Sequence, residues 1–300
     1  MSNSGLCGGC GAEVADGCAN SLALVGARTV HWECWSHCNL RCGFCYRTHG
    51  EPLSPNDAVR LLRILKVGGV ETIVLTGGDP ALRGDLRQLV DLTRGLDMVP
   101  VVHTNAHTLT ASTWEALARC DHIGLSLDAH DPLIHDTMRG RRGNHARVVD
   151  TLRRCSDSGM DVHVRSLVSA MNWHVVHHLG PFLARYPCVR SWRLLEFTPV
   201  ELGWQNRNAH TVSTERLNEA YRRAAEGFAH VELLRTADKI DAYMMVSPHG
   251  LAYGVTENDS INNGRHRYVG SLLTDHLAGI AAQVFISPAS HAQRRRFASS

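Results

Sequence analysis

Three cysteines of this 300-residue chain stand close enough in sequence to bind one metal cluster. Cys38, Cys42 and Cys45 have the spacing C-x3-C-x2-C. Three soft thiolates on one short loop suit three irons of a 4Fe–4S cubane, and the fourth iron then has no protein ligand. A structural zinc site normally has four ligands, and this loop offers three. The spacing therefore predicts a cluster with one open iron, where a small molecule can bind and receive an electron.

The aromatic residues beside the last cysteine add to this pattern. Cys38–Cys45 reads CNLRCGFC, with Phe44 directly before Cys45 and Tyr46 directly after it. This stretch resembles the signature loop of the radical S-adenosylmethionine (SAM) superfamily. The resemblance implies that SAM binds the open iron and that its reductive cleavage gives a 5′-deoxyadenosyl radical. It also implies that this radical abstracts hydrogen from a substrate, and that Phe44 and Tyr46 lie at the cofactor.

Short polar motifs at the ends of later predicted strands extend the resemblance over residues 29–200. Gly77-Gly78-Asp79-Pro80 is similar to the family's Gly-Gly-Glu-Pro, which binds the SAM amino group; Asp79 keeps the charge of Glu with a shorter reach. Glycines at such a position let the backbone approach a ligand closely. The SAM contacts that the resemblance implies are Gly77, Gly78, Asp79, Asn105, Ser126, Asp128 and Arg139.

Within the superfamily the nearest resemblance is to the viperin-like branch, whose type member dehydrates a cytidine nucleotide. The stretches that carry it are Cys38–Cys45, Arg139–Cys155 and Val189–Glu196. The run Arg139–Arg147 is rich in arginine, which binds phosphate or carboxylate in bidentate fashion. We therefore expect Arg141 and Arg142 to bind an anionic substrate, although a charge run is usually a solvated face. Glu196 is expected either to bind a substrate hydroxyl or amine, or to be a satisfied carboxylate of the barrel.

The remaining cysteines allow two interpretations. Cys7, Cys10, Cys18 and Cys34 together offer four ligands for a zinc knuckle or a second iron–sulfur cluster. The alternative, which we favour, is a glycine-rich leader with unpaired thiols. Cys120, Cys155 and Cys188 stand singly among apolar residues and are expected in the core.

The composition indicates where in the cell the protein is located, but not which partner it binds. The formal net charge is +2, so bulk charge indicates neither nucleic acid nor any other partner. No stretch approaches the roughly 20 apolar residues of a membrane span, and the N-terminus lacks the basic start and apolar run of a secretory signal. We expect a cytoplasmic protein without a membrane partner, in which ten cysteines are metal ligands, reactive thiols or buried residues rather than disulfides.

Strand-like and helix-like segments alternate through the middle of the chain. Six such strands predict an α/β fold with a parallel sheet, and an open (β/α)6 TIM-type barrel fits better than a doubly wound sheet. The expected strands are Thr29–Trp35, Thr72–Leu75, Val101–His103, His122–Leu127, Val162–Val168 and Ser191–Phe197. The expected helices begin at Ser54-Pro55 and cover Asp85–Arg94, Ser112–Ala118 with a Ser112/Glu115 capping box, His145–Ser158 and Trp173–Arg185.

These elements divide the chain into three parts. Residues 1–28 are a Cys/Gly-rich extension, residues 29–203 are the barrel core, and residues 204–300 are a C-terminal α+β cap and tail. In the cap we expect helix Thr214–Phe228 and strands Val231–Leu234, Ala242–Val246 and Leu251–Val255. The carboxyl ends of the barrel strands are where sites form in such folds.

The sequence thus predicts a biosynthetic radical SAM enzyme acting on a small, polar, anionic molecule such as a nucleotide, nucleoside or sugar derivative. Dehydration, decarboxylation, epimerisation and rearrangement all remain open. The resemblance implies a flavodoxin- or ferredoxin-type electron donor. One rival is a peptide-modifying radical SAM enzyme, against which the absence of a leader-binding domain at the short N-terminus counts. A rival of another class is a non-enzymatic iron–sulfur or zinc regulatory protein, which leaves Gly77-Gly78-Asp79 unexplained.

Overall fold

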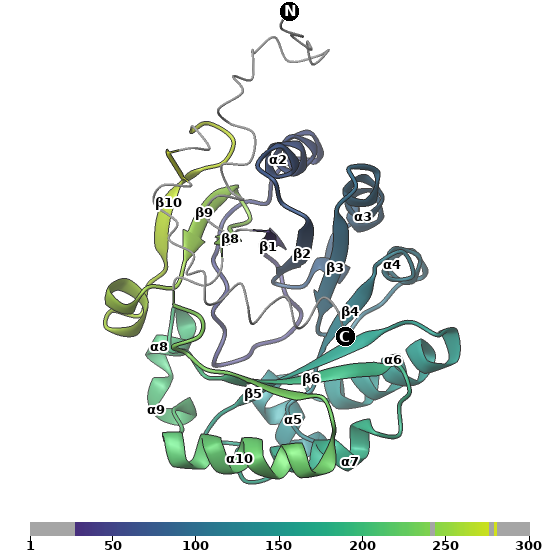
Figure 1. Ribbon diagram of the computed structural model, residues 1–300, viewed down its shortest axis with the longest axis vertical. Helices are drawn as coiled ribbons and strands as arrows, with labels where there is room; N and C mark the ends of the chain where they lie inside the picture. The colour runs from purple at the N-terminus through teal and green to yellow at the C-terminus, as the bar shows by residue number, and fades with distance from the viewer. Residues whose placement is uncertain (1–27, 241–243, 276–278, 281–300) are drawn as a thin grey trace, which may run out of the picture.

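The strands form one curved sheet with helices on its outer side. The computed structural model describes residues 28–240, 244–275 and 279–280. Over these residues the sheet has ten strands in the order β10-β9-β8-β1-β2-β3-β4-β5-β6-β7. Figure 1 shows the strands curving around a central space, with α2, α3, α4 and α6 outside them. The expected α/β fold with an open barrel is confirmed.

The central part of the sheet is the predicted series of parallel strands. Each pairs with the next along the chain, which is the arrangement that right-handed crossover units produce. The strands are β1 (Thr29–Trp35), β2 (Thr72–Gly77), β3 (Val99–Thr104), β4 (His122–Ser126), β5 (Val162–Val168) and β6 (Val189–Glu196).

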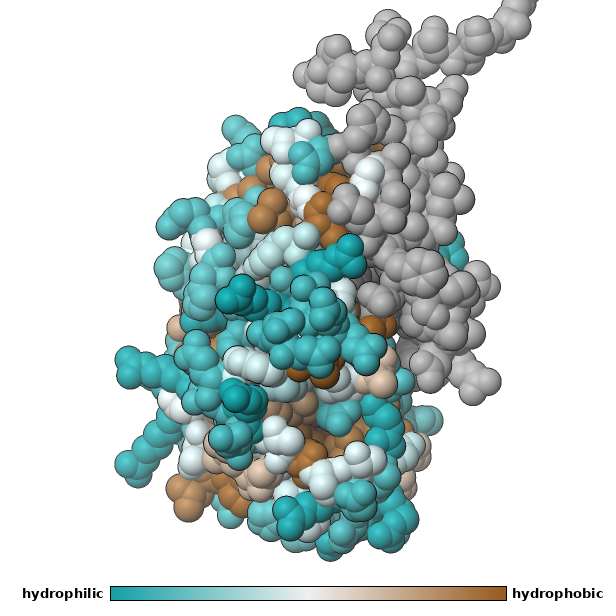
Figure 2. All heavy atoms as spheres, turned by 90° about the vertical axis from the view of Figure 1, so that its left-hand side faces the viewer, coloured by the Kyte–Doolittle hydropathy of each residue, from teal (hydrophilic) through white to brown (hydrophobic). Residues whose placement is uncertain are grey.

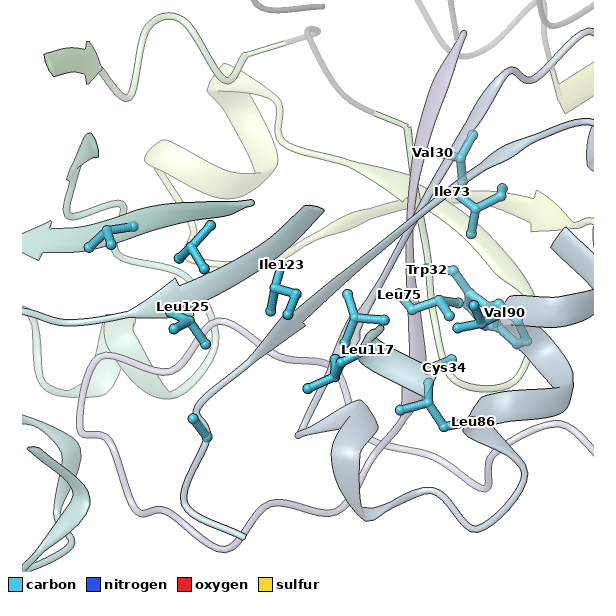
Figure 3. Packing of buried hydrophobic residues seen from close by; sticks show 14 of the residues in the cluster. Val30, Trp32, Cys34, Ile73, Leu75, Leu86, Val90, Leu117, Ile123 and Leu125 are labelled. Carbon is cyan, nitrogen blue, oxygen red and sulfur yellow. The ribbon is translucent and has the colours of Figure 1, made fainter. Parts of the chain in front are cut away.

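Successive side chains of each strand point to opposite faces of the sheet. On β1, Val30, Trp32 and Cys34 are fully buried in the hydrophobic core. Figure 3 shows this layer, with Cys34 of β1 beside Leu86 of α3. His31 and Glu33 of the same strand consequently face the barrel interior. Strand β5 alternates in the same way, which sends His163 and Arg165 inward.

The connecting helices begin where local sequence allows it. Ser54 is the N-cap of the first of them, accepting a hydrogen bond from the Asp57 amide at 3.2 Å, as the sequence predicts. The α-helices are α2 (Pro55–Val67), α3 (Leu86–Gly95), α4 (Ala111–Leu117), α5 (Pro132–Arg139), α6 (Asn144–Ser158), α7 (Leu179–Leu183), α8 (Leu202–Gln205), α9 (Arg207–His210) and α10 (Thr214–Gly227). Shorter helical turns are η1 (Pro80–Leu82), η2 (Val176–His178) and η3 (Glu257–Ile261).

Two helix predictions are wrong in detail. The Ser112/Glu115 capping box does not form, because Thr110 is the N-cap of α4 and accepts from the Thr113 amide at 3.2 Å. The expected helix Trp173–Arg185 is reduced to η2 and α7, since Pro181 has no amide proton for a longer helix. Helix α5 is not among the predicted helices, although Asp131 before Pro132 is a helix-start signal.

The C-terminal segment is α+β, as expected, and its strands extend the barrel sheet at both edges. Strand β7 (Val231–Leu234) pairs parallel with β6, and β8 (Met244–Val246) pairs parallel with β1. Strands β9 (Leu251–Gly254) and β10 (Arg267–Ser271) continue antiparallel from β8. The division at residue 203 stays a prediction.

The outer surface is mostly polar on the side of β10 and α8. Figure 2 shows this face, where hydrophilic side chains dominate and apolar ones are interspersed. Leu202 and Tyr268 are among the larger apolar side chains left exposed. Within the described ranges, no helix combines the length and the apolar character that crossing a bilayer requires.

Candidate active site

The three motif cysteines lie on the long loop between β1 and α2. In Figure 1 this loop crosses one end of the barrel before it returns to α2. All three thiols are free and partly buried. Burial raises the pKa of the Cys42 thiol to about 12. Cys45 and Cys38 also act to raise it, because a thiolate there would lie close to other thiolates, whereas the Arg139 guanidinium acts to lower it. A cationic group is what would stabilise three thiolates together.

The donor set fits a 4Fe–4S cluster better than a single metal ion. Among the residues that the structure describes, no three His, Cys, Asp or Glu side chains gather around one ion-sized point. A cubane needs no such point, since each cysteine binds a different iron. Cys38, Cys42 and Cys45 are therefore the residues that would hold the cluster.

Gly77 and Gly78 allow the cluster loop to cross the end of β2. The Gly78 amide donates to the Trp35 carbonyl at 2.6 Å, and the Asp79 amide donates to the His37 carbonyl at 2.8 Å. A Cβ atom on Gly78 would overlap the His37 carbonyl, and Gly77 adopts φ +127°, which disfavours other residues. The sequence predicts that a ligand approaches the backbone of these glycines closely. In the structure, the backbone of the cluster loop makes this close approach.

Asp79 and Asn105 link two strand ends to this loop. The fully buried Asp79 carboxylate accepts from the Ala81 amide at 2.9 Å, the Thr104 hydroxyl at 2.8 Å and the Asn105 amide at 3.2 Å. Burial raises the pKa of Asp79 to about 6. Asn105 Nδ2 lies 2.9 Å from Asn39 Oδ1 and 3.5 Å from Cys38 Sγ. The oxygens of Asp79 are thus engaged within the protein, so this side chain positions its neighbours.

Asp128 and Arg139 form a buried ion pair beside the cluster loop. Arg139 donates to the two carboxylate oxygens of Asp128 at 2.6 and 2.9 Å. Its guanidinium lies 5.1 Å from the ring centre of Phe44, and its carbonyl oxygen is 3.6 Å from Cys42 Sγ. Asp128 also accepts from the Leu167 amide at 2.9 Å, so its role is to hold Arg139.

Two further predicted cofactor residues lie on the same side. Ser126 is the last residue of β4 and is partly buried. The Tyr46 side chain is 37% exposed, and its carbonyl lies 2.8 Å from His266 Nε2. The predicted cofactor residues thus lie on the cluster loop or at the ends of β2, β3 and β4, except Arg139, which is the last residue of α5.

The segment from α8 to α9 holds the cluster loop from the C-terminal side, and the sequence analysis did not anticipate it. The Gly203 amide donates to the Cys45 carbonyl at 3.2 Å, and Asn206 Nδ2 donates to the Gly43 carbonyl at 2.9 Å. The His210 ring packs 5.5 Å from the ring of Phe44. These residues carry no sequence motif, so only the fold reveals them.

The predicted substrate residues fall in different places. Arg141 Nε lies 3.0 Å from His107 Nε2, which lines a hollow between α4 and α6. Both helices lie outside the barrel strands (Figure 1). Arg142 is exposed in the same connection. Arg141 and Arg142 thus lie in the connection from α5 to α6, after the fourth strand, as expected, and their role toward the substrate stays a prediction.

Glu196 has a partner within the protein. At the end of β6 its carboxylate accepts from the Thr236 amide at 2.6 Å. Its carbonyl accepts from Lys239 Nζ, which also donates to Thr198 Oγ1 at 2.8 Å. Burial lowers the pKa of Lys239 to about 7; Arg165 of β5 also acts to lower it, whereas Glu196 acts to raise it. Lys239 and Arg165 are not among the predicted site residues, because a basic residue in the middle of a strand and another beyond β7 leave no spacing pattern.

The other cysteines can be placed only in part. Cys34 is fully buried in the core, where burial raises its pKa to about 12. Its side chain faces α3, away from the barrel interior (Figure 3). Cys7, Cys10 and Cys18 lie outside the described residues. Cys155 and Cys188 are buried, and Cys120 is partly buried.

The sequence of the chain is similar to those of known proteins. Residues 32–175 match the family model of the radical SAM superfamily. The chain is 25% identical over 249 residues to an S-adenosylmethionine-dependent nucleotide dehydratase of Lacinutrix mariniflava, covering 77% of this chain and 51% of that protein. It is 27% identical over 230 residues to a protein of the same name from a Thermoplasmatales archaeon, covering 74% and 81%. The chain thus spans about half the length of the first relative.

Solved structures show the same architecture. Streptococcus suis SuiB bound to S-adenosylmethionine superposes with a TM-score of 0.66 at 17% identity, covering 90% of this chain and 68% of that chain. The same protein has been solved with its precursor peptide SuiA. At this identity the likeness concerns the fold alone. From the match of residues 32–175 to the family model and the similarity to the two relatives, the chain belongs to the radical SAM superfamily.

Proposed function

We propose that this chain is a radical SAM enzyme whose cluster is held by Cys38, Cys42 and Cys45. The observation that carries the proposal is the position of these thiols on a loop packed against Gly77 and Gly78. When bound, the cluster supplies the electron that cleaves SAM reductively to a 5′-deoxyadenosyl radical. The protein's own part is to hold the three ligands and to keep one side of the cluster clear of a fourth.

The residues around the loop have distinct tasks in this proposal. Arg139, held by Asp128, presents a fixed guanidinium beside Phe44, where it suits the carboxylate or ribose of SAM. Asn105 steadies Cys38 and Asn39, and Gly203 and Asn206 hold the carbonyls that flank Phe44. Preorganisation of this kind lowers the cost of placing reactants in contact.

We propose further that the substrate is a nucleotide and that the reaction is its dehydration, as in the viperin-like branch. Two relatives carry the name nucleotide dehydratase, which favours dehydration over the other reactions. The charges of Lys239 and Arg165 repel each other, which acts to lower the pKa of Lys239, while the Glu196 carboxylate acts to raise it. An anionic group between them would relieve that repulsion. These two cations replace Arg141 and Arg142 as our candidates for the substrate's phosphates.

The test is anaerobic reconstitution followed by reduction with dithionite in the presence of SAM. We expect 5′-deoxyadenosine, a higher rate with one of the four common nucleoside triphosphates, and a product lighter by one water. Cys42→Ala should abolish 5′-deoxyadenosine, whereas Cys155→Ala, a core thiol, should retain it. A fully loaded protein that leaves SAM intact would refute the enzyme. Cleavage that no nucleotide accelerates would refute the substrate class.

Peptide modification is the alternative for the same site. SuiB, whose fold this chain shares, has been solved with a precursor peptide. Transfer of deuterium from a labelled substrate to 5′-deoxyadenosine distinguishes the two, because only the true substrate gives labelled product. A non-enzymatic regulator would give no 5′-deoxyadenosine at all.

A further inference from the structure

A group of exposed basic side chains lies on the outer side of the cluster loop. We call it the basic face, and it consists of Arg41, His107, Arg141, Arg142, Arg147 and Arg154. Its five arginines are all exposed, and His107 is partly exposed. His107, Arg147 and Arg154 also line a hollow of about 210 Å³ between α4 and α6. The other five residues are far from Arg41 in sequence and come to this side of the molecule only through the fold.

Backbone contacts fix the basic face against the cluster loop. The Arg41 amide, between Cys38 and Cys42, donates to the Arg139 carbonyl at 3.1 Å. Gly140 packs so closely on the Arg41 carbonyl that a Cβ atom would overlap it. Asn39 Nδ2 donates to Thr108 Oγ1 at 3.1 Å, next to His107. The basic face is therefore the protein surface directly outside the cluster ligands.

The arginines of this face are not neutralised by the chain itself. Across the described residues, none of its five arginines forms an ion pair with Asp or Glu. By contrast, Arg87 of α3 forms an ion pair with Glu115, and Arg119, just after α4, forms one with Asp91. Two carboxylates lie near these arginines. Asp136 already accepts hydrogen bonds from the Gly143 and His145 amides at 2.5 and 2.8 Å, and Asp150 lines the hollow.

We infer that the basic face is the docking surface of a small acidic redox protein that carries a one-electron donor, of the flavodoxin or ferredoxin type. The inference rests on the proposed function, because reductive SAM cleavage consumes one electron per turnover. The reduced donor loses that electron, the oxidised cluster gains it, and no atom is transferred. Complementary charge steers such encounters and orients the partners, and docking here brings the donor beside Cys38 and Cys42.

Binding tests the surface without depending on turnover. A recombinant flavodoxin is titrated into the full-length protein by isothermal calorimetry at low salt. The variant Arg141→Gln/Arg142→Gln/Arg147→Gln should bind roughly tenfold more weakly and lose most of its salt dependence. The control Arg190→Gln/Arg222→Gln/Arg223→Gln removes the same charge from exposed positions elsewhere and should bind like the parent. Equal affinity of the first variant and the parent would overturn the inference.

A second measurement separates this inference from the proposed function. SAM cleavage is driven either by dithionite or by flavodoxin with its NADPH-dependent reductase. In the triple variant of the basic face we expect an unchanged rate with dithionite and a loss of roughly tenfold with flavodoxin. Equal losses with both reductants would show that these arginines act on the cluster site and not on docking. Absence of cleavage by the parent with dithionite would refute the proposed function and leave the binding result standing.

Discussion

Arg139, the last residue of α5, donates two hydrogen bonds of 2.6 and 2.9 Å to Asp128, which follows β4. The Asp128 side chain is 0% exposed and that of Arg139 is 11% exposed. Because the guanidinium also faces the ring of Phe44, the pair connects the barrel wall to the cluster loop. A buried pair of this kind is costly to break on one side, since the remaining charge keeps its desolvation penalty.

Replacing Asp128 by Asn should therefore destabilise the apoprotein by about 3 kcal/mol, because it leaves the Arg139 guanidinium buried without its counter-charge. The measurement is the free energy of unfolding in urea. As the control, Asp91→Asn removes a carboxylate from exposed pairs with Arg87 and Arg119, and should cost about 1 kcal/mol or less. Similar losses in the two variants would show that the Asp128–Arg139 pair contributes no more than a surface contact.

Gly78 should tolerate no side chain. A Cβ atom at this position would overlap the His37 carbonyl, so Gly78→Ala must displace the cluster loop. We expect the reconstituted variant to hold less than about half of the four irons of a full cluster. Gly84→Ala is the matched control, since no atom lies within 4 Å of a Cβ there. Full iron content in Gly78→Ala, measured by colorimetric assay, would contradict this account of the glycine pair.

Local sequence patterns were sufficient to predict the fold and the position of the cluster loop. Alternating strand and helix signals implied a parallel sheet, and this implied that the ends of β1 to β4 share one side of the barrel. The Cys38–Cys45 spacing then placed chemistry on the first of these ends. Strand β7 follows β6 in the chain and continues the series. What local patterns could not supply is the pairing of β8 with β1, because these two strands are far apart in the chain order.

The individual side-chain roles depended on tertiary contacts. Asp79 and Asp128 match motif positions, yet their oxygens are engaged by Thr104 and Arg139, which no spacing rule reveals. The basic run Arg139–Arg147 lies at the end of α5 and the start of α6, as expected. Sequence alone does not indicate which of its side chains face a substrate.

Iron binding should require the cysteines of the cluster loop but not the core cysteine Cys34. Alanine at Cys45 should remove the cluster, whereas alanine at Cys34 should leave iron binding intact, because Cys34 lies in the core against α3. The Cys34 variant should lose some stability, on the order of 1 kcal/mol, through the lost packing. Iron content and urea unfolding are measured on both. Loss of iron in the Cys34 variant would revive a role for this thiol with Cys7, Cys10 and Cys18.

Glu33 should make stability depend on pH in a direction opposite to that of an ordinary carboxylate. It lies fully buried on β1 and accepts hydrogen bonds from the Thr48 amide and hydroxyl at the far end of the cluster loop. Burial raises its pKa from 4.5 to about 7. Since the folded state then binds the proton more tightly than the unfolded state, this group favours folding most at low pH. Its contribution falls as the pH rises from about 4.5 to 7.

The comparison of the parent with Glu33→Gln isolates this effect, because the amide keeps the size of the side chain and an oxygen that can accept from Thr48. Relative to the variant, the parent apoprotein should lose up to about 3 kcal/mol of unfolding free energy between pH 4.5 and 7. The difference should be flat above pH 8, where the carboxyl is ionised in both states. Urea unfolding across this range measures it. A difference that stays constant from pH 4.5 to 7 would mean that Glu33 titrates alike in the folded and unfolded chains.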